Sequence, residues 1–274
     1  MEMQVSNNMN FSLLKSNIKS NWVIFAFIAF MLTIYTTVSV GMFNPENAEL
    51  MEGLMTMLPE QMVKAFGFSD LGTELTTYLA GYLYGFIMFV FPIIYIVITA
   101  NSLLAGHVDK GTMAYILSTP NKRNRIVITQ IIYFILAISV LITYATMVVI
   151  IMSAIMWPGH LDYIGYIFLN IVTIVILTSI GSVCFLASAF FNDSKKSVGA
   201  GAGLAMFFVM INMLSGVSED LDFLKNLTPV SLLDANRILE DFSYGLTVSG
   251  MLIIILSVIF FISIKVFEKK NLPI

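Results

Sequence analysis

Residues 126–156 read IVITQIIYFILAISVLITYATMVVIIMSAIM, a stretch that contains no Asp, Glu, Lys or Arg. A helix of about 20 apolar residues is long enough to cross the ~30 Å hydrocarbon layer of a bilayer. A second uncharged stretch, residues 163–191, follows after the sequence WPGHLD at 157–162. Because this junction combines two helix breakers with an acid, we expect a tight turn between two antiparallel membrane helices.

The composition of the whole chain is typical of a membrane protein. Of its 274 residues, 58% are hydrophobic and 11% are charged, against about 45–50% and about 25% in an ordinary soluble domain. The mean hydropathy is +0.89, so most of the surface must face lipid. The net charge of −3 argues against a nucleic-acid partner, which would require a basic face. The single cysteine, Cys184, cannot by itself form an intramolecular disulfide or a structural metal site.

Windows without Asp, Glu, Lys or Arg mark the candidate membrane spans, because an ionised side chain is costly at the bilayer centre. Six such windows occur, and they predict an all-α integral membrane protein that forms a single domain over residues 1–274. The first window follows a polar stretch and is longer than the apolar region of a signal peptide, so we expect it to be retained. The six helices are expected at 22–43, 78–105, 126–156, 163–191, 198–217 and 246–264.

The distribution of charge predicts the orientation of these spans. If the N-terminus is cytoplasmic, 11 of the 14 Lys and Arg residues lie on the cytoplasmic side, and 13 of the 17 Asp and Glu residues lie outside. Every loop then obeys the positive-inside rule. With an even number of spans, both the N- and C-termini are expected to be cytoplasmic.

Three segments outside the spans have an amphipathic pattern. Residues 10–20 place Phe11, Leu14 and Ile18 on one helical face, which predicts a helix on the cytoplasmic membrane surface, although a simple polar leader fits equally well. The outer segments 44–77 and 219–244 each predict short amphipathic helices on either side of a proline. These helices could rest on the outer leaflet or cap the membrane domain.

The chain lacks the sequence patterns of membrane enzymes and of nucleotide hydrolases. His107 and His160 are expected on opposite membrane sides, and no His-Glu-x-x-His, Gly-x-Ser-x-Gly or Gly-x-x-x-x-Gly-Lys-Ser/Thr pattern occurs. We therefore expect no catalytic site, no bound metal or cofactor, and no ATP hydrolysis by this chain alone. The absence of acids and bases from the spans also disfavours a self-powered carrier. Side chains such as Thr143 and Asn170 leave Na⁺ binding open, but we interpret them first as interhelical hydrogen-bonding groups.

Small residues gather at the beginning of the fifth span, in the sequence GAGAG at 199–203. Small side chains allow two membrane helices to approach closely. We interpret Gly199, Gly201 and Gly203 as a packing surface, either within the chain or against a second copy.

The connection between the second and third spans, residues 106–125, is too structured for a spacer. Gly111 allows a turn, Thr112 can cap a helix, and Pro120 can end one. We expect a short helix parallel to the membrane that a cytoplasmic partner could bind in a groove, with Tyr115 and its two apolar neighbours as anchors. An ordinary basic loop is the alternative.

The sequences DKGT at 109–112 and LSTP at 117–120, followed by Arg123, resemble a known signature. It is the Gly-Thr … Leu-x-x-Pro-x-x-Arg pattern between the second and third spans of type-2 ABC transporter permeases, the membrane subunits of bacterial multidrug, peptide and antibiotic-immunity exporters. The resemblance includes the N-terminal surface helix, the six spans, and the outer sequences LPE at 58–60 and LTP at 227–229. His107 is a departure, because many relatives have an acid ahead of the Gly-Thr pair.

The resemblance implies a permease that pairs with a second permease copy, identical or related, and with two cytoplasmic ATPase subunits. ATP and Mg²⁺ would bind to those ATPase subunits, and the short helix after Gly111 would act as a coupling helix. The residues expected to carry this coupling are Asp109, Gly111, Thr112, Tyr115, Leu117, Pro120 and Arg123.

The sequence thus favours the membrane subunit of an ATP-driven exporter in a bacterial plasma membrane, with no enzymatic site of its own. A domain rich in Met and Phe fits an amphipathic peptide, an antimicrobial or a hydrophobic drug as substrate, although lipid contact explains the same composition. The alternative function is a self-powered secondary transporter or channel without an ATPase partner.

Overall fold

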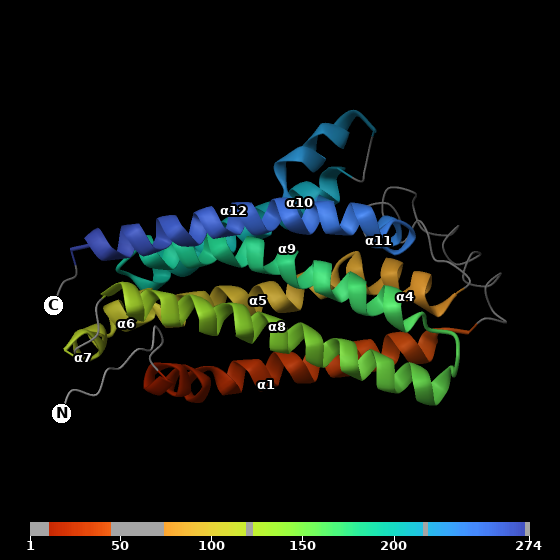
Figure 1. Ribbon diagram of the computed structural model, residues 1–274, viewed down its shortest axis with the longest axis horizontal. Coiled ribbons are helices and arrows are strands. Elements are labelled where there is room, and N and C mark those ends of the chain that lie inside the picture. The colour runs from red at the N-terminus through yellow and green to blue at the C-terminus, as the bar shows by residue number, and fades with distance from the viewer. Residues whose placement is uncertain (1–10, 45–73, 119–122, 216–218, 272–274) are drawn as a thin grey trace, which may run out of the picture.

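The computed structural model describes residues 11–44, 74–118, 123–215 and 219–271, and every regular element in them is helical. The membrane helices run along one another as an elongated bundle (Figure 1). The elements are α1 (Phe11–Met42), α4 (Leu75–Tyr84), α5 (Ile87–Leu103), α6 (Ala105–Asp109), α7 (Met113–Leu117), α8 (Arg123–Met156), α9 (Tyr163–Phe190), α10 (Ser194–Ser215), the 3₁₀ helices η3 (Glu219–Leu227) and η4 (Pro229–Leu232), α11 (Ala235–Glu240) and α12 (Phe242–Lys269).

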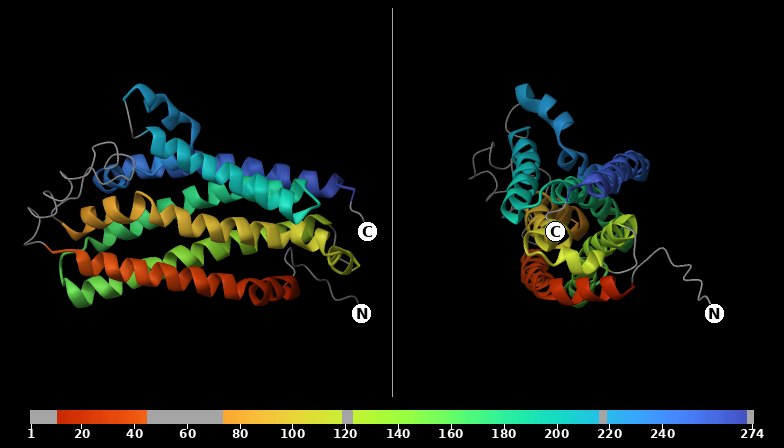
Figure 2. Two further views of the ribbon diagram at one scale, coloured as in Figure 1. Left: turned by 180° about the vertical axis from the view of Figure 1, so that it is seen from behind. Right: turned by 90° about the vertical axis from the view of Figure 1, so that its left-hand side faces the viewer.

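Helix α9 lies at the centre of the bundle and packs against α5, α8, α10 and α12. In its most apolar window 67% of the residues are buried, against 22% in α12. Fully buried side chains such as Tyr166 and Phe185 fill the space between α9 and its neighbours. On the far side of α8 lies α1, which packs mainly against α8 and α5. The bundle is therefore built around α9, with α1 and α12 towards its periphery (Figure 2).

Five of the expected spans are single helices that are long and apolar enough to cross a membrane: α1, α8, α9, α10 and α12. The second expected span, 78–105, is not one helix but the pair α4 and α5, bent by 47°. The break occurs because Phe86 leaves helical geometry, with φ −145° and ψ −53°. Counted as one broken span, this pair completes the six.

At the N-terminal end of the described chain, the structure differs from the expected surface helix followed by a separate first span. The predicted surface helix at 10–20 and the predicted first span form one helix that begins at Phe11. No Pro or Gly lies between residues 11 and 40 to interrupt it. Its first turns nevertheless lie across the end of the bundle, as the right-hand view of Figure 2 shows.

Aspartates fix the beginnings of several helices by capping. The carboxylate of Asp162 accepts a hydrogen bond from the Ile164 amide at 3.1 Å at the beginning of α9. Asp241 caps α12 through the Ser243 amide at 2.9 Å. Asp193 accepts from two amides at the beginning of α10, and these backbone hydrogen bonds lower the pKa of its carboxyl group. Each cap satisfies N–H groups that a helix terminus leaves unpaired.

The predicted turn between α8 and α9 is confirmed. Gly159 has φ +83°, a left-handed conformation that favours glycine. The indole N–H of Trp157 donates a hydrogen bond to the carbonyl of Val40 at 3.0 Å, and its ring packs edge-on against Phe43. These contacts attach the turn to the end of α1.

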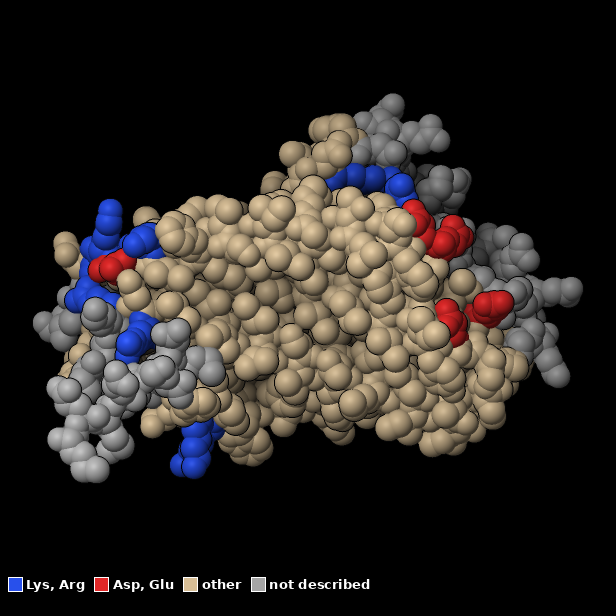
Figure 3. Space-filling view, viewed as in Figure 1, with Lys and Arg blue, Asp and Glu red and all other residues tan. Residues whose placement is uncertain are grey.

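Charged side chains lie at the two ends of the bundle, and an uncharged zone separates them (Figure 3). Helix α1 begins and α12 ends at the same end of the bundle, where α6 and α7 also lie (Figure 1). The described basic residues of the segments at this end are Lys15, Lys19, Lys110, Arg123, Arg125, Lys195, Lys196, Lys265, Lys269 and Lys270. The separation of charge agrees with the predicted topology, whereas the assignment of this end to the cytoplasm stays a prediction.

The two outer segments differ in what the structure describes. Most of 44–77, including the LPE sequence at 58–60, lies outside the described residues. In the second segment, η3 precedes Pro229, η4 begins at Pro229 and α11 follows, as the proline in the sequence indicated. The hydroxyl of Thr228 donates a hydrogen bond to the carbonyl of Phe208 at 3.0 Å and caps η4 through the amide of Val230. This part of the connection is thereby attached to the side of α10.

Candidate functional site

The connection between α5 and α8 forms a sharp elbow at the basic end of the bundle. Helix α5 ends where Leu104 leaves helical geometry, and the Ala105 amide that this break frees is bound by the hydroxyl of Ser188 on α9 at 3.0 Å. Helix α6 follows, and the chain then turns at Gly111, which has φ +70°. A residue with a side chain would be strained in this conformation. The turn at Gly111 thus separates α6 from α7.

His107 and Thr112 close this elbow from the two sides of Gly111. The imidazole Nδ1 lies 2.9 Å from the Thr112 hydroxyl, and that hydroxyl lies 3.2 Å from the His107 carbonyl. The hydroxyl has one proton, so both contacts are satisfied when Nδ1–H donates to Thr112 and Thr112 donates to the carbonyl. Burial, and secondarily the charge of Lys110, lowers the pKa of His107.

Thr112 does not act as the helix cap that the sequence predicts. It precedes α7, but its φ of −71° and ψ of −15° are helical, and its side chain caps no amide of α7. A capping side chain requires an extended backbone at that position in order to reach the next amides. The hydroxyl bonds to His107 instead.

Helix α7 presents one aromatic side chain to the outside. Met113 is buried, and Ile116 and Leu117 pack against the bundle core. Tyr115, by contrast, is 79% exposed. The helix is thus held on one side, while Tyr115 extends from the other side with no apolar cover from the residues that the structure describes.

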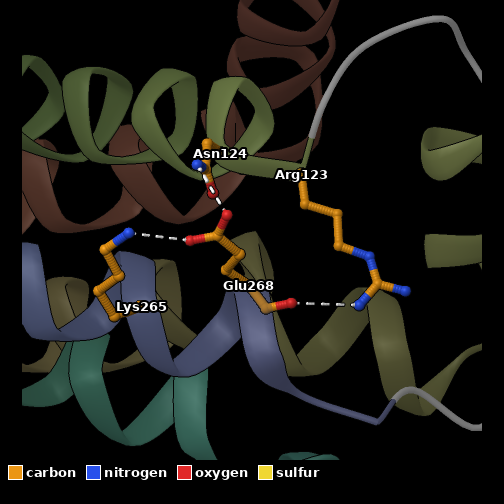
Figure 4. Close-up of polar contacts among 4 residues, drawn as sticks. All are labelled: Arg123, Asn124, Lys265 and Glu268. Carbon is orange, nitrogen blue, oxygen red and sulfur yellow. Dashed lines mark hydrogen bonds and ion pairs between the residues drawn. The ribbon is translucent and has the colours of Figure 1, made fainter.

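The beginning of α8 is bound to the end of α12 (Figure 4). Arg123 donates to the carbonyl of Lys270 at 3.1 Å, and its nitrogen lies 3.5 Å from the carbonyl of Glu268. The Asn124 amide donates to the Glu268 carboxylate at 3.1 Å, and Lys265 forms an ion pair with the same carboxylate at 3.2 Å. We call Arg123, Asn124, Glu268 and Lys270 the C-terminal clasp.

Lys270 connects this clasp to α9. Its ammonium donates to the carbonyl of Ala189 at 2.9 Å and to that of Phe191 at 2.7 Å. The last carbonyls of a helix have no partners within the helix, and a cation is favourable there. Burial lowers the pKa of Lys270 to about 8. The last turn of α9 therefore holds both α6, through Ser188, and the end of α12, through Lys270.

A family model described as ABC-2 family transporter protein matches residues 14–272. The chain belongs to the ABC-2 transporter family. Among curated proteins, the comparison finds no match. Members of this family are membrane permease components of ABC transporters. The membership that the sequence of residues 109–123 indicated is therefore confirmed. The chain is a multi-pass membrane protein.

In this ABC-2 permease, the described residues predicted for coupling lie in the elbow, on α7 and in the C-terminal clasp. Gly111 and Thr112 form the elbow, with Asp109 exposed at the end of α6. Tyr115 and Leu117 lie on opposite sides of α7. The list is completed by Arg123, which belongs to the C-terminal clasp, and Pro120, which lies outside the described residues.

The three glycines of α10 do not share one surface. A side chain at Gly201 would contact the backbone and side chain of Cys184 on α9 at 3.5 Å, so Gly201 faces the bundle. Gly199 and Gly203 face outwards, and a side chain at either position would have no neighbour within 4 Å among the described residues. Gly201 therefore packs within the chain, which is one of the two interpretations of this glycine sequence; the other is packing against a second copy.

Sequence reasoning missed several residues of this permease. His107 is absent from the residues expected to carry coupling, and the sequence does not single out Asn124, Glu268 or Lys270. The three-residue spacing of Lys265 and Glu268 was the one available signal, since residues so spaced are neighbours on a helix. Contacts between α8 and α12 join residues more than 140 positions apart, and no local pattern records them.

Proposed function

We propose that this ABC-2 permease is the membrane-spanning subunit of an ATP-driven exporter, and that α7 is its coupling helix. Membership of the family implies an ABC ATPase as partner. The observation that carries the proposal is the exposed Tyr115 on a short helix whose other side packs against the bundle. An aromatic side chain of this kind fits a groove in a partner and is typical of an interface hot spot.

In this proposal, two ATPase subunits bind ATP and Mg²⁺ and close on each other. The motion reaches Tyr115, and the elbow closed by His107 and Thr112 passes it to α6 and α5. The C-terminal clasp passes it from the beginning of α8 to the end of α12. This chain supplies no chemical step, and its role is to convert the motion into exposure of a pathway to one side and then the other.

A second permease copy, identical or related, completes the proposed assembly. The outward side of α10 supports this, because Gly199 and Gly203 leave it open beside the exposed apolar side chains of Met206 and Phe207. Small residues permit close approach of two membrane helices. We propose this side of α10 as the contact between copies.

We further propose an amphipathic peptide, an antimicrobial or a hydrophobic drug as the substrate. The bundle has an uncharged zone between its charged ends (Figure 3), and its apolar residues include adaptable methionines. Such a zone suits a cargo with a large apolar part better than a highly charged one.

The decisive experiment is a pull-down of the tagged chain from its native membrane in mild detergent, with an assay of ATPase activity and identification of the partner. We compare the parent chain with Tyr115→Ala and with a matched control, Tyr163→Ala, which removes an exposed tyrosine at the opposite end of the bundle. We expect the parent and Tyr163→Ala to retain a stoichiometric ATPase and Tyr115→Ala to lose most of it.

Two outcomes would contradict the proposal. If Tyr115→Ala binds and stimulates the ATPase as the parent does, α7 is not the coupling helix. If the chain is isolated alone even after cross-linking in intact membranes, there is no ATPase partner, and ion-driven transport becomes the better explanation.

A further inference from the structure

In the first turns of α1, two amide side chains are buried while large apolar side chains are exposed. Asn17 and Asn21 are buried against the bundle. Phe11, Ile18 and Trp22 are exposed, and Trp22 retains 59% of its accessible surface. At about 100° per residue, these three side chains fall within about 40° of one another around the helix axis. They form one outward apolar stripe.

Hydrogen bonds on the buried side fix the direction of this stripe. The Asn17 amide donates to the Gln130 side chain of α8. The Ser102 hydroxyl of α5 donates to the side-chain oxygen of Asn21 at 2.7 Å, and the amide of Asn21 donates to the carbonyl of Asn17 at 3.0 Å. Rotating the helix to bury the apolar stripe would break the hydrogen bonds to Gln130 and Ser102, and the fully buried Gln130 side chain would lose its partner at a cost of about 1–3 kcal/mol. The stripe therefore stays on the outside.

Two lysines accompany the stripe at one turn's spacing. Lys15 and Lys19 are exposed, and they lie to one side of the line from Phe11 to Trp22. The first turn of α1 contains no acid, and neither lysine forms an ion pair with any residue that the structure describes. The surface thus combines an apolar stripe with two positive charges that the described part of the chain does not neutralise.

The boundary between acyl chains and negatively charged headgroups satisfies both parts of this surface. The apolar stripe is favourable in hydrocarbon, and the ammonium groups are favourable beside anions, so the two requirements meet where acyl chains and negatively charged headgroups adjoin. We propose that the first turns of α1 bind anionic phospholipid, with headgroup phosphates at Lys15 and Lys19 and acyl chains along Phe11, Ile18 and Trp22. This inference does not depend on the proposed function, since it requires neither an ATPase nor a substrate.

The other exposed lysine pair at this end of the bundle provides a contrast. Lys195 and Lys196 begin α10, and their amides bond to the carboxylate of Asp193. An acid therefore lies directly beside these lysines, whereas the first turn of α1 contains none. This pair is a matched control for two lysines at the same end of the molecule.

Trp22 provides a direct reporter for the test. The chain has two tryptophans, and Trp157→Phe leaves Trp22 as the single one, at the cost of the hydrogen bond to Val40 at the far end of the bundle. The full chain is reconstituted in vesicles of three parts phosphatidylcholine to one part phosphatidylglycerol. Brominated phosphatidylglycerol or brominated phosphatidylcholine is then introduced at equal mole fraction, and quenching of Trp22 fluorescence is measured.

We expect brominated phosphatidylglycerol to quench Trp22 with a relative binding constant about tenfold above that of brominated phosphatidylcholine, falling as salt is raised. In the double variant Lys15→Gln/Lys19→Gln, Trp22 should be quenched equally by the two lipids. In Lys195→Gln/Lys196→Gln, Trp22 should still be quenched more strongly by brominated phosphatidylglycerol. Continued quenching by brominated phosphatidylcholine in the first double variant shows that α1 is still folded in contact with lipid.

Three results would overturn the inference. Equal quenching by both lipids in the Trp157→Phe parent removes the preference for anionic lipid. A preference that survives in Lys15→Gln/Lys19→Gln places its source elsewhere. Absence of quenching by either lipid shows that something other than lipid, such as another protein segment, covers the stripe.

Discussion

His107 is a single side chain on which the geometry of the elbow between α6 and α7 depends. Its imidazole and the Thr112 hydroxyl join the two sides of the turn at Gly111, and the pKa of the imidazole is lowered by burial and by Lys110. The folded elbow therefore favours neutral His107, and an opened elbow, in which the imidazole has its ordinary pKa, binds a proton more readily. The elbow is fully stable above the ordinary pKa of about 6.5 and loses stability as pH falls below it.

The prediction is that the elbow opens more often in acid. Hydrogen exchange of the amides of residues 105–117, corrected for intrinsic rates, should be a few-fold faster at about pH 5.5 than at about pH 7.5. A His107→Gln variant keeps a polar side chain without titrating in this range and should show no such change. Equal exchange in the parent at both pH values, or an acid response retained in His107→Gln, would show that His107 is not the responsible group.

At the scale of helices, Lys270 connects the end of α12 to the last turn of α9. Lys270→Met keeps most of the apolar stem and removes both hydrogen bonds to the carbonyls of Ala189 and Phe191. Because the group is only half-buried, we expect a loss of about 1 kcal/mol in stability. A thermal unfolding series in detergent should show a lower Tm for Lys270→Met.

The neighbouring Lys269 supplies the control for this measurement. Its side chain is exposed, so Lys269→Met removes the same charge from the same end of α12 without removing a described hydrogen bond to α9. We expect its Tm to stay near that of the parent. Equal losses in the two variants would mean that net charge, and not the contact with α9, determines the effect.

The helices and their breaks differ in how far they could be predicted from the sequence. The positions of α8, α9 and α12 follow from the cost of charge in the bilayer, and the sequence contains that information directly. The break between α4 and α5 could not be predicted, because the absence of charge in a window indicates that the segment is apolar but not that its helix is continuous. The elbow was predicted from Gly111, but the bond between His107 and Thr112 depends on the left-handed turn itself.

For the whole molecule, the proposed contact between two copies makes a direct prediction. Cys184 is the single cysteine, and at 3% exposure it is shielded from reagents, so Gly203→Cys places one reactive thiol on the outward side of α10. In native membranes treated with a mild oxidant, Gly203→Cys should form a disulfide-linked dimer if the copies are identical. This is read as a band of twice the mass on a non-reducing gel.

Gly250→Cys is the matched control, because Gly250 on α12 is also exposed with no neighbour within 4 Å among the described residues. It should remain monomeric under the same oxidation. Dimers of Gly250→Cys in place of Gly203→Cys would move the contact from α10 to α12.

The last turn of α9 sets a limit on how the basic end of the bundle can move. Ser188 holds the amide of Ala105, and the carbonyls of Ala189 and Phe191 hold Lys270, so two separate arms are attached within four consecutive residues. A displacement that pulls α6 strains the same turn that restrains α12. The C-terminal ends of α5 and α12 are therefore expected to shift in one concerted step, with the last turn of α9 as their common pivot.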